Sequence, residues 1–85
     1  MEYVIVAFRS RAHTVRFSDF LRSNGVANEI VNTPKEAGVG CGLSVKINKS
    51  SFSAVKNGVR ILSLSSFAGF FLVSNIGGKR IVRTI

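Results

Sequence analysis

Cys41 is the only cysteine of the chain, and it lies within Gly38-Val39-Gly40-Cys41-Gly42, directly before a strand-like run. A thiolate is a good nucleophile, so this thiol could act as a nucleophile or as a carrier. Because Gly40 and Gly42 have no Cβ, another molecule could approach the sulfur closely. Cys41 is therefore the first candidate for chemistry in this sequence.

A structural role for Cys41 is the alternative. Cys41 shares its parity with Leu43, Val45 and Ile47, so a regular strand would point the thiol into the core, where cysteine behaves as a small hydrophobe. Glycine on both sides instead indicates irregular backbone. The residues alone leave both interpretations open.

The expected surroundings of Cys41 are electropositive. Lys35 precedes it on the same loop, and Arg9 and Arg11 are expected near the end of the neighbouring first strand. Such cations would favour a thiolate, persulfide or selenide anion. His13 could act as a base toward Cys41, although a lone histidine is more often a capping or solvated side chain. No third group is evident to orient it, which argues against hydrolase chemistry.

Neither a metal site nor a phosphate loop is predicted. The potential metal ligands are few and show no ligand spacing; besides Cys41 they are Glu2, His13, Asp19, Glu29 and Glu36. The glycine-rich loop precedes a strand instead of opening a helix, as a phosphate-binding loop would. We expect no metal and no cofactor. A free thiol suits a reducing compartment, so we predict a cytoplasmic protein.

Composition is typical of one small globular domain. The 85 residues are 46% hydrophobic, and we assign residues 1–75 to the domain and residues 76–85 to a basic tail. The N-terminus shows no signal-peptide features. Residues 61–78 carry no charge, but serines, glycines and Asn75 interrupt them, so no membrane span is predicted.

The net charge of +8 favours an acidic partner or a polyanion. The twelve basic residues are dispersed, except for Lys79, Arg80 and Arg83 in the tail. Nucleic-acid binding is therefore possible but not favoured.

Hydrophobic periodicity predicts the order β-α-β-β-α-β. The expected strands are 3–8, 26–31, 43–47 and 68–73; the first helix spans 11–24, capped by Ser10 and closed by Gly25. Residues 48–51 turn and cap the second helix, whose apolar positions are Phe52, Val55, Val59 and Leu62. This order predicts a ferredoxin-like α+β sandwich: a four-stranded antiparallel sheet, first and third strands central, with both helices on one face.

The first and fourth strands have apolar residues on both faces of the sheet. The face that the helices leave open therefore needs a cover. We expect a second copy of the chain, giving a homodimer, or alternatively the tail 77–85, which alternates enough to add a fifth strand. The phenylalanines predict core packing, whereas Ser44 and Lys46 on the open face argue against base stacking.

The chain also resembles a known family. The segments that carry the resemblance are Asn24-Gly25-Val26, Thr33-Pro34-Lys35-Glu36 and Gly40-Cys41-Gly42-Leu43-Ser44-Val45. They are similar to the small selenium/sulfur carrier-like domains, over about residues 3–73. The family's cysteine falls on Cys41 and its Thr-Pro pair on Thr33 and Pro34. The resemblance implies a carrier of sulfur or selenium.

We therefore predict a carrier or accessory protein instead of a free-standing enzyme. Cys41 would accept sulfur or selenium from a donor protein as a persulfide or selenide and pass it to an acceptor protein. Lys35 would stabilise the anion, Gly40 and Gly42 would give access, and Thr33 and Pro34 would support the loop. The alternative is a non-enzymatic basic module that binds nucleic acid or an acidic protein.

Overall fold

The computed structural model describes all residues from Met1 to Ile85. The strands are β1 (Glu2–Phe8), β2 (Asn28–Asn32), β3 (Leu43–Asn48), β4 (Phe67–Ile76) and β5 (Lys79–Thr84). The helices are α1 (Arg11–Ser23) and α2 (Phe52–Leu62), with 3₁₀ turns η1 (Lys35–Ala37) and η2 (Lys49–Ser51).

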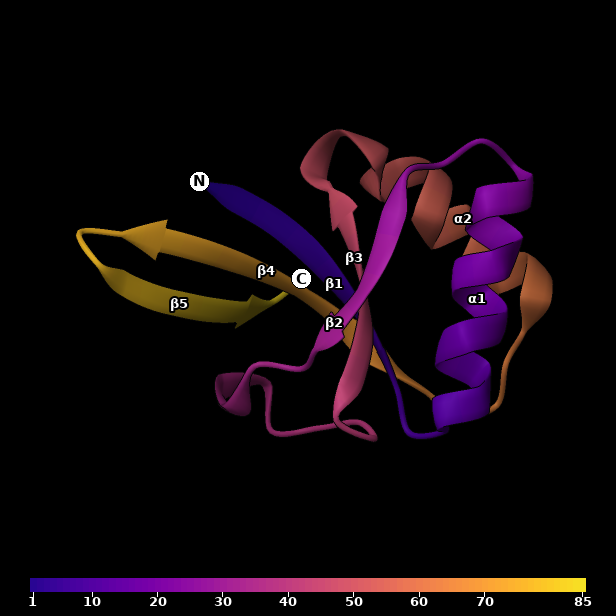
Figure 1. Cartoon of the computed structure of the whole chain (residues 1–85), viewed down its shortest axis with the longest axis horizontal. Coiled ribbons are helices and arrows are strands. Elements are labelled where there is room, and N and C mark those ends of the chain that lie inside the picture. The colour runs from indigo at the N-terminus through magenta and orange to yellow at the C-terminus, as the bar shows by residue number, and fades with distance from the viewer.

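The protein is an α+β fold with two helices and one five-stranded antiparallel sheet. The strand order is β2-β3-β1-β4-β5, and both helices lie on the same side of the sheet (Figure 1). The sheet differs from the four-stranded one that we predicted. The tail adds β5 beside β4, so β4 is an interior strand and β1 alone is the middle strand.

Strand β1 is buried on both faces, as its continuous apolar run predicted. On the helix side, Val4, Val6 and Phe8 belong to a cluster with residues of β3, α1 and α2. On the opposite side, Ile5 and Ala7 form a second cluster with Phe71 and Val73 of β4. The core therefore has two layers, one on each side of the sheet.

The second layer is covered within the same chain. Ala37 and Val39, from the connection between β2 and β3, and Val82 of β5 pack against it. Ile5 and Ala7 are 0% exposed, so the open apolar face that we expected does not exist at these residues. The connection was not among the covers that we considered. A second copy is thus not needed to bury this part of β1.

The helix ends follow from local chemistry. The Ser10 hydroxyl accepts a hydrogen bond from the His13 N–H, which caps α1. Gly25, with φ of +72°, follows the C-cap residue Asn24. The predicted cap of α2 is different, because Ser51 makes no side-chain capping bond and η2 leads into the helix instead.

Close packing against α1 explains why α2 has a glycine, Gly58, at a buried position. A Cβ at this buried position would lie 3.1 Å from Cε2 of Phe20 in α1. The glycine therefore lets the two helices approach closely, which offsets its cost of roughly 1 kcal/mol in helix propensity against alanine. Neither helix has the length and apolar character that crossing a membrane requires.

Candidate functional site

Thr33 and Ser44 close the base of the loop that carries Cys41. The Thr33 N–H donates to the Gly42 carbonyl over 2.9 Å, and the Thr33 and Ser44 hydroxyls are hydrogen-bonded over 2.6 Å. Ser44 is fully buried in β3, and Pro34, which follows Thr33, is buried as well. The Thr-Pro pair thus anchors the loop and has no contact with the sulfur.

The backbone around Cys41 is irregular, as the flanking glycines predicted. Gly40 has φ of +95° and Gly42 has φ of +94°, a conformation that side chains disfavour. The Cys41 N–H donates to the carbonyl of Phe8, the last residue of β1, over 3.0 Å. A Cβ on Gly40 would lie only 3.2 Å from that same oxygen. Gly40 therefore permits the close approach that fixes Cys41 against β1.

The sulfur of Cys41 lies against the first turns of α1. Its Sγ is 3.7 Å from the Thr14 hydroxyl and 3.6 Å from the Leu43 carbonyl, to which the thiol can donate. Cys41 is half-buried, so it is neither a core residue nor a freely exposed one. Thr14 is fully buried and was not among the residues that we selected from the sequence.

Thr14 places a neutral hydrogen-bond donor next to the Cys41 sulfur. Its hydroxyl can turn to the Ser10 carbonyl at 3.2 Å, the Leu43 carbonyl at 3.4 Å or the Cys41 sulfur. A hydroxyl has one proton and can donate to only one acceptor at a time. The strongest hydrogen bond is the one to the acceptor with the most negative charge. If Cys41 loses its proton or carries a persulfide, that acceptor becomes the sulfur.

Lys35 lines a hollow formed by the part of the loop that precedes Cys41, together with Gly42. The hollow has a volume of about 250 Å³; its lining residues are Thr33, Pro34, Lys35, Gly38, Val39, Gly40 and Gly42. Cys41 is not among them, and Lys35 is exposed and makes no hydrogen bond to it. The structure thus brings all five predicted supporting residues together, whereas the Cys41 sulfur lies against Thr14 of α1 and does not line their shared hollow.

The His13 imidazole makes no hydrogen bond to Cys41. Its Nδ1 is hydrogen-bonded to the Ser66 hydroxyl, which also accepts from the Ser10 N–H over 3.2 Å. His13 therefore ties the start of α1 to the turn before β4. Arg9 and Arg11 lie on either side of Ser10, and both are exposed.

Two carboxyl groups elsewhere hold the fold by ion pairs. Hydrogen bonds from Arg80 of β5 lower the pKa of Glu36 in η1 below its ordinary value of 4.5. Hydrogen bonds from Lys49 and Ser74 likewise lower the pKa of Glu2. The Glu36–Arg80 pair, at 2.8 Å, joins the connection that carries Cys41 to β5.

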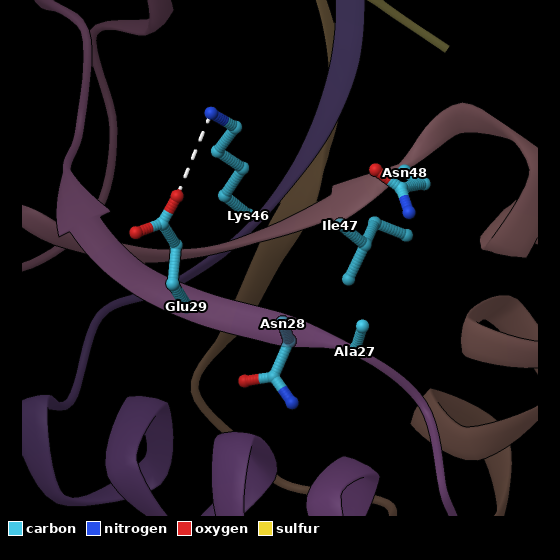
Figure 2. Close-up of a pocket in the computed structure, with 6 residues that line it drawn as sticks. All are labelled: Ala27, Asn28, Glu29, Lys46, Ile47 and Asn48. Carbon is cyan, nitrogen blue, oxygen red and sulfur yellow. Dashed lines mark ion pairs between the residues drawn. The ribbon is translucent and has the colours of Figure 1, made fainter.

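A second hollow lies at the far end of β3. It has a volume of about 320 Å³, and its lining residues are Ala27, Asn28, Glu29, Lys46, Ile47 and Asn48. Figure 2 shows Glu29 and Lys46 reaching toward each other from neighbouring strands, as an ion pair of 3.5 Å. Since Cys41 precedes the opposite end of β3, this hollow is separate from the cysteine site.

Fold and site together define a small α+β domain that presents one cysteine on a glycine-flanked loop. The sequence profile of the family described as putative Se/S carrier protein-like matches residues 2–60, and the chain belongs to that family. The match includes Cys41 and ends within α2, short of the boundary near residue 73 that the resemblance suggested. No curated protein and no solved structure shows a significant match.

Proposed function

We propose that Cys41 is the atom-carrying residue of a sulfur or selenium carrier. The Cys41 thiolate attacks the terminal sulfur of a persulfide on a donor protein. A new S–S bond forms at Sγ, the donor's S–S bond breaks, and the donor cysteine leaves with the electron pair as a thiolate. Attack by an acceptor thiolate reverses these roles and unloads Cys41. The exchange needs no outside oxidant and no cofactor.

The observation that carries this proposal is the setting of the Cys41 sulfur. It is half-buried on irregular backbone, with Thr14 placed to donate a hydrogen bond to it. A cysteine that merely filled the core would need neither the two glycines in left-handed conformations nor a polar neighbour. Family membership supports the same general function.

Other predicted residues take supporting roles in this proposal. Gly40 and Gly42 hold the loop conformation and leave access to the sulfur, and Thr33 and Pro34 anchor it. Lys35, Arg9 and Arg11 contribute positive charge around the loop without touching the thiol. His13 stabilises the start of α1, and we assign it no proton transfer at Cys41.

The partners in this proposal are a donor and an acceptor protein in a reducing compartment such as the cytoplasm. Self-association through the sheet is no longer required to bury Ile5 and Ala7. We therefore favour a cover within one chain, formed by the tail that we considered as the alternative together with the Cys41 connection, which we did not consider.

Mass spectrometry after incubation with a persulfide-loaded cysteine desulfurase tests the proposal. We expect the wild-type chain to gain the mass of one sulfur atom at Cys41, reversibly by thiol. The Cys41→Ser variant should gain nothing and should change the free energy of unfolding by less than about 1 kcal/mol, because the residue is only half-buried.

A matched control tests whether any exposed thiol would accept sulfur from the desulfurase. Ser53 is exposed on α2, so Ser53→Cys in the Cys41→Ser background supplies a thiol away from the loop. Equal loading of this variant would overturn the proposal. So would a loss of several kcal/mol in Cys41→Ser, since Cys41 would then be a core residue.

A further inference from the structure

All four side-chain carboxylates of the chain are engaged in ion pairs. The pairs are Asp19–Arg22, Glu29–Lys46, Glu2–Lys49 and Glu36–Arg80. The remaining lysines and arginines form no ion pair; they are Arg9, Arg11, Arg16, Lys35, Lys56, Arg60, Lys79 and Arg83. The excess positive charge is therefore carried by side chains that are free to meet an external anion.

Two of these free cations belong to the backbone segment that adjoins Cys41. Arg9 directly follows Phe8, whose carbonyl accepts the hydrogen bond of the Cys41 N–H. Arg11 is exposed one helical turn before the buried Thr14, whose hydroxyl contacts the Cys41 sulfur. We call the surface formed by Arg9, Arg11 and Cys41 the cysteine edge.

No carboxylate forms an ion pair with Arg9 or Arg11 at the cysteine edge. Glu2 lies at the opposite end of β1, six residues from Phe8, or about 20 Å along an extended strand. Glu36 is bound to Arg80, and neither Arg9 nor Arg11 has a carboxylate partner. An incoming acidic group would therefore meet cations that are exposed and not neutralised.

We infer that the cysteine edge docks onto a carboxylate-rich surface of the protein that exchanges sulfur or selenium with Cys41. This inference rests on the proposed function and adds the chemical class of the partner surface. Arg9 and Arg11 would steer and orient the partner toward the Cys41 thiol. Complementary charge of this kind raises association rates by about 10- to 1,000-fold at low salt.

The number of cations favours a protein partner over nucleic acid. Sequence-independent binding to nucleic acid commonly engages about six to ten phosphates, whereas the cysteine edge offers two arginines. Of the other free cations, Lys35 lies in η1 on the loop that carries Cys41, Arg16 lies on α1, and the remaining four lie on α2 and β5. Two arginines are instead sufficient to orient a pair of carboxylates on a protein surface.

Peptides that carry a thiopyridyl mixed disulfide provide the test. The Cys41 thiolate attacks the peptide sulfur, a Cys41–peptide disulfide forms, and thiopyridine leaves with the electron pair and is measured by absorbance. Three peptides of equal length would be compared: aspartate-rich, asparagine-rich and lysine-rich. We expect the aspartate-rich peptide to react about tenfold faster than the asparagine-rich one at low salt, with the ratio approaching one at high salt.

Charge-neutral variants locate the effect. Arg9→Gln/Arg11→Gln should bring the ratio between the acidic and neutral peptides close to one. Lys56→Gln/Arg60→Gln removes the same charge from the exposed face of α2 and should preserve most of the ratio. Because each ratio is taken within one variant, any change in the intrinsic reactivity of Cys41 cancels.

The outcomes separate this inference from the proposed function. If Cys41 reacts with no peptide in the folded protein, the proposed function fails. If all three peptides react equally, or both double variants lower the ratio alike, the docking inference fails and the carrier proposal stands. If a single-stranded oligonucleotide blocks the neutral peptide, and Arg9→Gln/Arg11→Gln relieves the block, the edge binds nucleic acid and the inference is overturned.

Discussion

The hydroxyl of Thr14 lies 3.7 Å from the sulfur of Cys41, although the two residues are 27 positions apart in the chain. Thr14 belongs to the buried face of α1, and Cys41 to the loop before β3. The two meet because the Cys41 backbone is hydrogen-bonded to the end of β1, directly before the helix begins. A polar side chain of the helix face thus becomes part of the cysteine site.

Replacing Thr14 should change the reactivity of Cys41 more than it changes stability. Thr14→Val keeps the shape of the side chain and removes its proton donor. We expect the alkylation rate of Cys41 at a fixed pH to fall about fivefold, because the anionic sulfur loses a hydrogen bond worth about 1 kcal/mol. Thr14→Ser should restore the rate. An unchanged rate in Thr14→Val would exclude a hydrogen bond from Thr14 to the anionic sulfur.

Thr33→Val should loosen the base of the loop. The substitution leaves the buried Ser44 hydroxyl without its partner, which costs about 1–3 kcal/mol. Urea denaturation would measure the loss, and Thr33→Ser should recover most of it. A Thr33→Val chain as stable as wild type would show that the loop does not depend on this hydrogen bond.

Gly40 and Gly42 should differ in how they tolerate alanine. Both have φ near +95°, so either substitution strains the backbone by about 1–3 kcal/mol. Only at Gly40 would the new Cβ also approach the Phe8 carbonyl, at 3.2 Å, whereas nothing lies within 4 Å at Gly42. We expect Gly40→Ala to be the less stable variant and to alter the alkylation rate of Cys41. The reverse order in a denaturation series would contradict this geometry.

The Glu36–Arg80 pair should make stability depend on pH in the acidic range. Because the folded state lowers the pKa of Glu36 below 4.5, its stabilising effect is complete above that value. It is lost as the pH falls from 4.5 through the lowered pKa. Glu36→Gln should therefore be less stable than wild type at neutral pH, and the two thermal midpoints should converge in acid. If the difference between the two thermal midpoints stays constant across the acidic range, ionisation of Glu36 adds nothing to stability.

Removing β5 should expose the second layer of the core. A chain ending at Asn75 loses Val82, which pairs with Val73 across the β4–β5 ladder, and leaves the edge of β4 open. Light scattering should then show a monomeric full-length chain and a self-associating truncated one. Ile81→Lys, at an exposed position of β5, serves as the control and should stay monomeric. A full-length dimer would instead show that a second copy covers the sheet.

The sequence predicted those parts of the fold that depend on strong hydrophobic periodicity. The uninterrupted apolar run of β1 predicted a strand buried on both faces, and Ser10 and Gly25 predicted the ends of α1. The tail was considered as a cover, and Val82 packs on the second layer. The part of the cover formed by Ala37 and Val39 was missed, because they stand among glycine and charged residues and show no period. Only their position in space gives them a role in the core.

The same limit applies to the cysteine site. Cys41, Gly40 and Gly42 could be selected because their types are distinctive. Thr14 could not be selected by type, although one signal was present. It falls on the apolar face of α1 with Phe17 and Leu21, where a buried hydroxyl needs a partner. The position of the sulfur, against α1 and outside the hollow that Lys35 lines, depends on backbone angles that no pattern in the sequence specifies.

The connection from Thr33 to Gly42 presents Cys41 and also covers the second layer through Ala37 and Val39. Displacement of this connection would therefore have two effects at once. A partner that moved it to reach the sulfur would also uncover Ile5 and Ala7, and its binding free energy would have to offset that exposure.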